Sequence, residues 1–399
     1  MPTDPLPSHI ERPHLRPIQP VPVMKDGKQL VALRDPAMLV PQTMVVPVQV
    51  MGILQHLQGR LTLEELSDRT GGDLRQLTEL VKNLDQLGLL WGPRFEQMES
   101  QRWEELQQEG AFPVRSSNML GEDESICRNA LEEYFQETED PEIDGPVIGL
   151  VAPHLDYERG WPNYAAAYYG LRERTAPERV VVLGTNHNGL GDGVVLSELG
   201  FDTPLGRCRA DKAVTDRLVE RLGRPLIADQ LDHLSEHSIE LQLPWIQYCF
   251  GNVPIVAALI PDPLVPMIAE DGQRTPLEPF VDALSETLGE LGGETLLVAS
   301  SDLSHVGPQF GEPRAVDDQR RLDVERHDRE MMSKFVAGDP EEFLAAMAWN
   351  KNPTRWCSIG NMAALLMLAR PRRVELIDYR QAYDERGMAL VSSAAMALA

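Results

Sequence analysis

The sequence predicts an α/β protein with a central sheet flanked by helices, preceded by a small α+β unit. From Gly145 onward, short apolar runs rich in β-branched residues alternate with amphipathic helical patterns, which is typical of a sheet covered on both faces. Before residue 94, three short helical patterns follow one strand pattern. The 399 residues, 42% hydrophobic and 25% charged, suit a globular chain of two or three domains.

Charge and cysteine content exclude several classes of protein. With 37 Lys and Arg against 62 Asp and Glu, the net charge is −25. Such a field repels phosphates, so we expect neither nucleic-acid nor membrane partners. No apolar stretch approaches the roughly 20 residues needed to span a bilayer, and the N-terminus lacks the apolar region of a secretory signal. Four cysteines are too few for a disulfide framework, so we expect a cytoplasmic protein.

Composition divides the chain into four segments. Residues 1–22 contain seven prolines, whose spacing disfavours helix and predicts an extended, flexible arm. Residues 23–93 predict a small domain, and the polar, acidic residues 94–144 predict connecting helices. Residues 145–399 carry the α/β pattern.

The 23–93 segment has the pattern of a winged-helix domain. Gln29–Leu33 predicts a strand and Val45–Leu57 predicts a first helix. Thr62–Glu65 has the spacing of a capping box, so a second helix should begin there, and Asp73 should cap a third. The third helix is net acidic, which makes it a poor DNA-recognition helix.

The 145–399 segment contains five apolar runs separated by helical patterns. The runs predict strands at Val147–Ala152, Val180–Leu183, Val253–Ile260, Thr295–Ala299 and Val374–Ile377. The clearest helical patterns are Asp211–Leu222, Leu277–Leu291 and Val316–Val336.

Polar side chains follow three of these predicted strands. His154 follows the first strand, His187 follows the second, and Asp302 and His305 follow Thr295–Ala299. Ligands of α/β sheets bind at the carboxyl ends of the strands, so we expect these side chains at one edge. A single histidine there would be an ordinary loop residue, but three of them predict a site.

Two further features are candidates for the same site. Ser235–Glu240 predicts a helix start with His237 and Glu240 on one face, either as a capping network or as part of the site. Cys357 precedes a predicted helix, whose N-terminus would favour the thiolate. It remains open whether Cys357 is a ligand, a nucleophile or a small buried side chain. Cys208 and Cys249 lack nearby histidines and are expected to be packing residues.

The sequence resembles a known family through six motifs in a fixed order. They are APH-x-x-Y at 152–157, LG-x-x-H at 183–187, TPLG at 203–206, EHSIELQLP at 236–244, SSDLSH at 300–305 and the segment around Cys357. Together they resemble the Memo family, known in bacteria as AmmeMemoRadiSam system protein B. That family is similar in fold to the class III extradiol dioxygenases of the LigB type.

The resemblance implies roles for six residues. His154, His187 and Cys357 would be metal ligands, and His237, Asp302 and His305 would be catalytic residues of the same pocket. Iron, as Fe²⁺, is the expected metal, with zinc and copper as alternatives, because two imidazoles and one thiolate suit all three. The chain departs from the family at residues 155–156, where Leu-Asp replaces a small Ala-Gly pair.

Three functions are compatible with this resemblance. The first is an iron-dependent, dioxygenase-like redox enzyme acting on an unknown small molecule or peptide. The second is a non-catalytic metal-binding adaptor that works with a radical-SAM partner and an AMMECR-type protein. The third is a zinc-dependent hydrolase. The LVALRDP, LQGRLTLEEL and LDQLGLL segments also resemble a PqqD-type domain, which implies peptide binding by strand addition.

Overall fold

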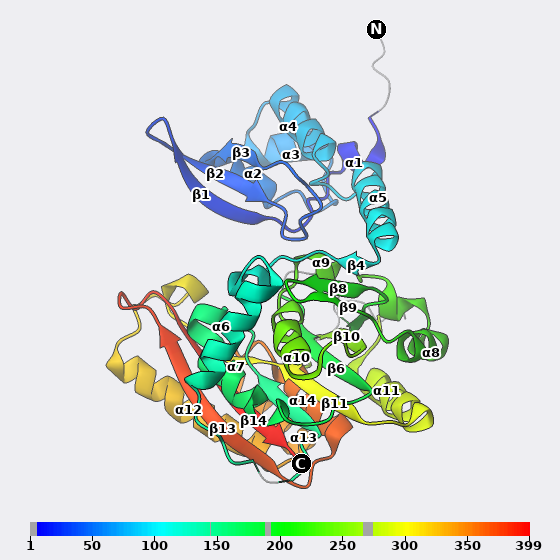
Figure 1. Cartoon of the computed structure of the whole chain (residues 1–399). Coiled ribbons are helices and arrows are strands. Elements are labelled where there is room, and N and C mark those ends of the chain that lie inside the picture. The colour runs from blue at the N-terminus through cyan, green and yellow to red at the C-terminus, as the bar shows by residue number, and fades with distance from the viewer. Residues whose placement is uncertain (1–5, 144, 188–192, 266–273) are drawn as a thin grey trace. The chain divides into compact units, whose positions relative to one another are not determined.

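The chain forms two compact units, Met1–Glu109 and Gly110–Ala399 (Figure 1). The computed structural model describes residues 6–143, 145–187, 193–265 and 274–399. The segment expected to connect two domains, 94–144, is divided between the units. Its first helix, α5 (Pro93–Glu109), belongs to the first unit, and α6 (Glu124–Gln136) belongs to the second.

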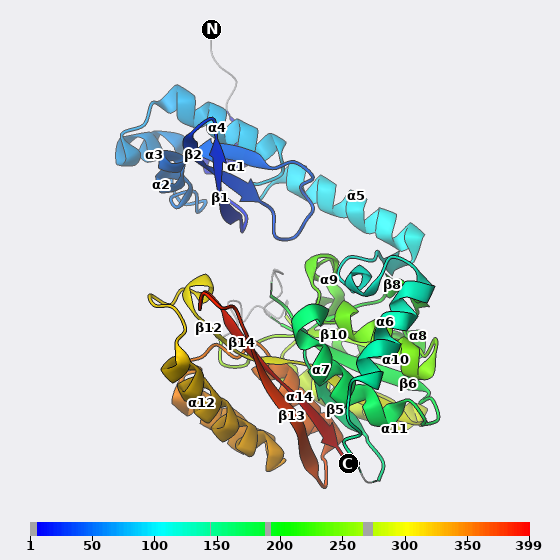
Figure 2. The same cartoon turned by 60° about the vertical axis from the view of Figure 1, so that its left-hand side comes forward.

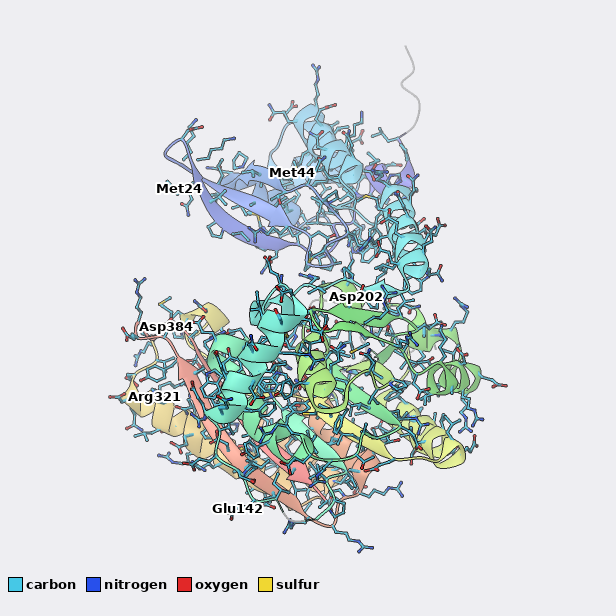
Figure 3. The ribbon with its side chains drawn as sticks, in the orientation of Figure 1. Met24, Met44, Glu142, Asp202, Arg321 and Asp384 are labelled. Atoms are coloured by element: carbon cyan, nitrogen blue, oxygen red, sulfur yellow. The ribbon has the colours of Figure 1, made fainter. Side chains whose placement is uncertain are left out.

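The first unit combines an antiparallel sheet with short helices. The sheet has the order β1 (Gln19–Lys25), β2 (Lys28–Arg34), β3 (Met44–Pro47). Besides α5, its helices are α1 (Ser8–Glu11), the 3-10 turn η1 (Val48–Val50), α2 (Met51–Leu54), α3 (Leu63–Thr70) and α4 (Leu74–Gln86). Met24 lies beside the turn of the β1–β2 hairpin (Figure 3).

The strand at 29–33 and the second and third helices are confirmed. Thr62 and Glu65 form the expected capping box, and Asp73 accepts a hydrogen bond from the Gln76 N–H. The predicted helix Val45–Leu57 is wrong at its start, because residues 44–47 pair with β2 and helical structure begins only at Val48. Its valines are β-branched and favour the strand.

The proline-rich N-terminus differs from the expected arm. Ser8–Glu11 is helical between two prolines, and Ile10 is buried in the core of the unit. Residues 19–25 form the edge strand β1. In its two-residue hairpin, Lys25 and Lys28 are the flanking pair, so residues 20 and 22 have their backbone nitrogens turned away from β2. Proline is tolerated there because no ladder hydrogen bond is lost.

The second unit is built on an eight-stranded sheet. Its order is β12-β14-β5-β11-β6-β10-β7, with β13 also paired to β14. The strands are β5 (Gly149–Ala152), β6 (Arg179–Thr185), β7 (Val195–Leu196), β10 (Ile255–Ile260), β11 (Thr295–Ser300), β12 (Asp302–Val306), β13 (Val374–Tyr383) and β14 (Leu390–Leu398). The four adjacent strands β5, β11, β6 and β10 are parallel. The same unit contains a separate three-stranded sheet in the order β4 (Ala111–Phe112), β8 (Gly200–Thr203), β9 (Gly206–Cys208).

Helices flank the sheet, as expected for an α/β fold (Figures 1 and 2). Helix α7 contacts β5, β13 and β14 and is joined by α6 and α10, whereas α14 contacts β5, β6 and β11 and is joined by α11 and α13. Figure 2 shows α12 alongside β13. These helices are α7 (Tyr157–Tyr168), α8 (Lys212–Leu222), α9 (Asp232–Ser235), α10 (Leu243–Phe250), α11 (Leu277–Leu291), α12 (Asp318–Val336), α13 (Pro340–Asn350) and α14 (Ile359–Ala369).

The five strands and three helices predicted for this segment are all present, whereas the short strands β7, β8 and β9 and the longer β12 and β14 were not predicted. In the described part of the chain, no helix is both long and apolar enough to cross a bilayer.

Candidate metal centre

The sheet brings the polar residues that follow its strands to one edge. Strands β5, β11 and β6 are parallel neighbours in that order, and His154, Asp302 and His187 each stand two residues beyond the end of one of them. The imidazole rings of His154 and His187 are 4.9 Å apart between centroids. Because these strands run in parallel, their carboxyl ends lie at one edge, and the side chains that follow them lie close together as expected.

Cys357 reaches the same place from the helical layer. It stands two residues before α14, which packs under β5, β6 and β11. Its Sγ lies 3.3 Å from His154 Nε2. The ligand atoms of His154, His187 and Cys357 all lie within 4.8 Å of one another. Two ligand atoms on one tetrahedral ion are about 3.5 Å apart, since metal–ligand distances are about 2.0–2.3 Å. The 3.3 Å between Cys357 Sγ and His154 Nε2 is close to this spacing.

Hydrogen bonds fix which nitrogen of each histidine faces the cluster. His154 Nδ1 is 3.0 Å from the Ser300 carbonyl oxygen, and His187 Nδ1 is 3.1 Å from a Glu236 carboxylate oxygen. Carbonyl and carboxylate oxygens only accept hydrogen bonds, so both Nδ1 atoms carry the proton. Nε2 is therefore the nitrogen of each ring that remains for the cluster, and in His154 it lies 3.3 Å from the Cys357 sulfur, an arrangement typical of metal-binding histidines.

His237 and His305 follow the same pattern. His237 Nδ1 is 3.3 Å from Glu236, and His305 Nδ1 is 3.0 Å from the Leu303 carbonyl oxygen and 3.2 Å from that of Arg355. Burial lowers the pKa of His237 and lowers that of His305 to about 4. Both imidazoles are therefore neutral at pH 7, and Nε2 is the ring nitrogen that can accept a hydrogen bond.

Asp302 holds the loop that carries His154. Its Oδ1 accepts hydrogen bonds from the backbone N–H groups of His154 and Leu155, at 3.0 and 3.2 Å, and its Oδ2 lies 3.7 Å from His154 Nε2. Burial raises the pKa of Asp302 to about 7. Asp302 is therefore adjacent to the cluster without being one of its three converging ligands.

Glu236 is a central residue that was not singled out from the sequence. Its buried carboxylate accepts hydrogen bonds from the backbone N–H groups of His187 and His237, both at 2.7 Å, in addition to its contacts with the two rings. Burial would raise the Glu236 pKa, but the hydrogen bonds that its carboxylate accepts from His187 outweigh burial and lower that pKa. Only its place in the EHSIELQLP motif pointed to it.

The expected helix at Ser235–Glu240 is wrong, and so is the shared face of His237 and Glu240. Helix α9 ends at Ser235, and a 3-10 turn, η5, begins at Glu240. Between them, the N–H groups of His237 and Ser238 bind the Glu236 carboxylate rather than helical carbonyls. Glu240 instead accepts hydrogen bonds from the backbone N–H groups of residues 115–117, each at 2.9 Å, so it anchors that segment.

The histidines open into a pocket of about 420 Å³. Its remaining walls are mainly apolar, formed by Met119, Leu155, Leu241, Phe310 and Val391. The two residues that depart from the family pattern are both here. Leu155 lines the pocket, and Asp156 caps α7 and pairs with Arg159, whose Nε lies 2.7 Å from Asp156 Oδ2.

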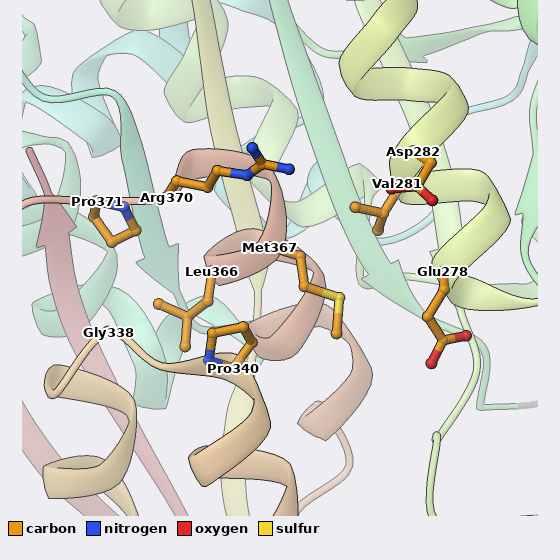
Figure 4. Close-up of a pocket in the computed structure, with 9 residues that line it drawn as sticks. All are labelled: Glu278, Val281, Asp282, Gly338, Pro340, Leu366, Met367, Arg370 and Pro371. Carbon is orange, nitrogen blue, oxygen red and sulfur yellow. The ribbon is translucent and has the colours of Figure 1, made fainter.

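A second hollow of similar volume has a different character (Figure 4). It lies between α11 and α14, with Arg370 facing Glu278 and Asp282. Its lining contains no histidine or cysteine, in contrast to the pocket at the sheet edge.

Fold and site together define an α/β protein with a His/His/Cys cluster at the carboxyl edge of its sheet. The model of the Memo-like protein family matches residues 118–397. The chain belongs to this family.

Relatives agree with this membership. A MEMO1 family protein of Methanopyrus kandleri is 30% identical over 255 residues, which covers 61% of this chain and 80% of the relative. One of Thermus thermophilus is 28% identical over 351 residues, covering 86% of this chain and all of the relative. One of Thermococcus onnurineus is 25% identical over 279 residues, covering 68% and 93%.

Proposed function

We propose that this Memo-family protein binds iron through His154, His187 and Cys357 and acts as a redox enzyme on a small molecule or peptide. One observation carries the proposal. Each imidazole has its Nδ1–H bound to an oxygen, so two Nε2 lone pairs and one sulfur converge within 4.8 Å. Hydrogen bonding that orients histidines in this way is the usual second layer of a metal site.

The donor set fits Fe²⁺. Two neutral imidazoles and one thiolate leave positions open, as in the facial triads of non-haem iron enzymes, although there the third ligand is a carboxylate. The iron would supply Lewis-acid and redox chemistry. We place the protein in the cytoplasm, because Fe²⁺ and a thiolate ligand both require a reducing compartment.

The pocket residues would handle protons and orientation. His305 is neutral and its Nδ1 is bound to carbonyl oxygens, so it would present Nε2 to a substrate hydroxyl and accept its hydrogen bond. His237 Nε2 is a second acceptor, and Asp302 Oδ2 would orient a bound water or His154. The apolar walls would contact the non-polar part of a substrate. These roles parallel those expected for a fold like that of the class III extradiol dioxygenases.

Two other functions share the same ligands. A zinc hydrolase is favoured by the thiolate, because Cys and His are the preferred ligands of zinc and an open fourth position activates water. A non-catalytic adaptor would use the metal only to shape a surface for a radical-SAM enzyme and an AMMECR-type protein.

The first unit would supply partner contacts in the adaptor function. Its sheet and three-helix pattern support the winged-helix or PqqD-like proposal. Strand addition at β1 is disfavoured, because its outward-facing positions include Pro20 and Pro22, which have no N–H to donate. A bound peptide would therefore contact this unit elsewhere than at the β1 edge.

Oxygen uptake by the iron-loaded protein tests the enzymatic proposal. With 4-methylcatechol as the probe, uptake should depend on iron and be lost in His305→Gln at unchanged iron content. His327→Gln is the matched control, because His327 lies on α12 and does not line the pocket. Equal uptake in both variants would contradict the role of His305. No uptake by fully loaded wild-type protein would favour the adaptor.

A further inference from the structure

The loop that carries Cys357 is held in an unfavourable backbone conformation. Among the described residues, seven non-glycine residues have a positive φ, and two of them, Asn352 at 45° and Arg355 at 59°, stand in this loop directly after Lys351, which caps α13 at 57°. L-residues avoid this region, so such a cluster persists only when its surroundings impose it. The contacts of residues 352–357 should therefore show what holds the cysteine in place.

Trp356, next to Cys357, is the anchor of the loop. Its backbone N–H donates to Asn352 Oδ1 at 2.7 Å, and its carbonyl accepts from Asn352 Nδ2 at 2.9 Å. Its side chain is 1% exposed, and the indole Nε1–H donates to Asp328 Oδ1 at 2.8 Å. The position of the indole thus fixes the backbone from which the thiol projects.

Asp328 is a fully buried carboxylate with only neutral partners. Its Oδ1 also accepts a hydrogen bond from Ser304 Oγ, and its Oδ2 accepts from Tyr379 Oη at 2.8 Å and from Ser392 Oγ at 2.5 Å. A buried charge without a cation is costly unless its hydrogen bonds compensate for the lost water. These four donors come from β12, β13, β14 and the Cys357 loop, so one carboxylate on α12 ties them together.

The same loop also sets the tautomer of His305. The backbone N–H of His305 donates to the Thr354 carbonyl oxygen at 2.7 Å, and the Arg355 carbonyl oxygen lies 3.2 Å from the ring nitrogen Nδ1 of His305. A shift of the loop would therefore displace a proposed ligand and a proposed proton acceptor at once.

We propose that Asp328, acting through the Trp356 indole, is a positioning residue that holds the strained 352–357 loop so that the Cys357 sulfur meets the two histidine Nε2 atoms. The inference rests on the proposed metal site. A positioning role differs from a purely structural one in a testable way. Of the hydrogen bonds to Asp328, only the one from the Trp356 indole should affect metal affinity.

Two variants that each remove one donor to Asp328 test this. Trp356→Phe removes the donor on the cysteine loop, and Tyr379→Phe removes a donor on β13. With Co²⁺ as the probe, the full-length protein should show a thiolate-to-cobalt absorption band. Trp356→Phe should weaken that band and raise the Co²⁺ dissociation constant about 10- to 100-fold, the range found for residues that orient ligands. Tyr379→Phe should leave both unchanged.

The outcomes separate the two proposals. Equal cobalt affinities in wild type, Trp356→Phe and Tyr379→Phe would overturn the positioning role, as would equal losses in both variants. No cobalt binding by the wild type would instead contradict the metal site. If Trp356→Phe does not fold, Asn352→Gly replaces it, because it deletes both contacts to the Trp356 backbone and tolerates the positive φ. It should weaken the same band, and an unchanged band would overturn the proposal.

Discussion

At the residue scale, the site depends on which nitrogen of each imidazole is free. The positions of His154 and His187 could be predicted, because residues that follow parallel strands meet at one sheet edge. Their tautomers could not be predicted, because the acceptors that fix them, the Ser300 carbonyl and the Glu236 carboxylate, come from distant segments. Glu236 and Glu240 also look equivalent in the sequence, yet only Glu236 contacts the histidines.

Glu236→Gln should weaken metal binding while Glu240→Gln should not. The amide nitrogen of glutamine cannot accept the hydrogen bonds that Glu236 receives from His187 and His237, so both rings lose their orientation. We expect the zinc dissociation constant, measured by chelator competition, to rise about 10- to 100-fold. Glu240→Gln disturbs only the anchoring of residues 115–117 and should lower thermal stability instead. Equal metal affinities of the two variants would contradict this assignment.

His233 should make the stability of the second unit depend on pH. Its buried ring lies against Phe112 and Phe201, and burial lowers its pKa to about 4. Between its ordinary value of 6.5 and pH 4, the unfolded chain binds a proton that the folded chain does not. The unfolding free energy should therefore fall as the pH falls through this range, by on the order of 3 kcal/mol from this residue. In His233→Phe, urea titrations should show a smaller fall of the unfolding free energy over this pH range. An identical pH profile in wild type and variant would contradict the role of His233.

At the element scale, strand periodicity predicted the parallel core of the sheet but not β14, which lies between β12 and β5. The sequence of β14 is LVSSAAMAL, and such small residues carry little strand signal. Their size is a tertiary requirement, since Ser393 binds Asn163 of α7. The turn at 236–240 was also missed. There the Glu236 carboxylate, rather than backbone carbonyl groups, accepts the hydrogen bonds of the His237 and Ser238 N–H groups.

Gly360 sets the position of α14 and so of Cys357. A Cβ at this residue would lie 2.2 Å from the Pro261 carbonyl oxygen at the end of β10. Gly360→Ala should force the start of α14 away from the sheet and lower the unfolding free energy by about 1–3 kcal/mol. Gly289→Ala is the control, because Gly289 lies within α11 and a Cβ there would meet no other atom within 4 Å. In Gly289→Ala, the unfolding free energy measured by urea denaturation should rise by about 0.5–1 kcal/mol. Equal effects of the two substitutions would show that the close approach does not matter.

At the scale of the whole molecule, each unit has its own core. One cluster contains buried residues between Ile10 and Leu90, and another contains residues from Val151 to Leu398. The α/β class of the second unit could be predicted from its alternating pattern, but the order of its strands could not, because pairing is set by contacts far apart in sequence. The Thermus thermophilus relative aligns over 351 residues, so the alignment extends into the first unit.

A fragment of residues 110–399 should bind metal as the full chain does. All three proposed ligands and the carboxylates that orient them lie in this unit. We expect the same zinc stoichiometry and dissociation constant for both proteins in calorimetry. Loss of binding in a fragment that keeps its secondary structure, judged by circular dichroism, would show that the first unit takes part in the site.

The most direct test of the central claim is the metal content of anaerobically purified protein, determined by mass spectrometry. We predict one iron per chain in the wild type, lost in His154→Ala and Cys357→Ser. The control variants His327→Ala and Cys249→Ser should retain it, because these residues lie outside the cluster. Zinc in place of iron would keep the site and favour the hydrolase. Metal that persists in both ligand variants, or is absent from the wild type, would contradict the account.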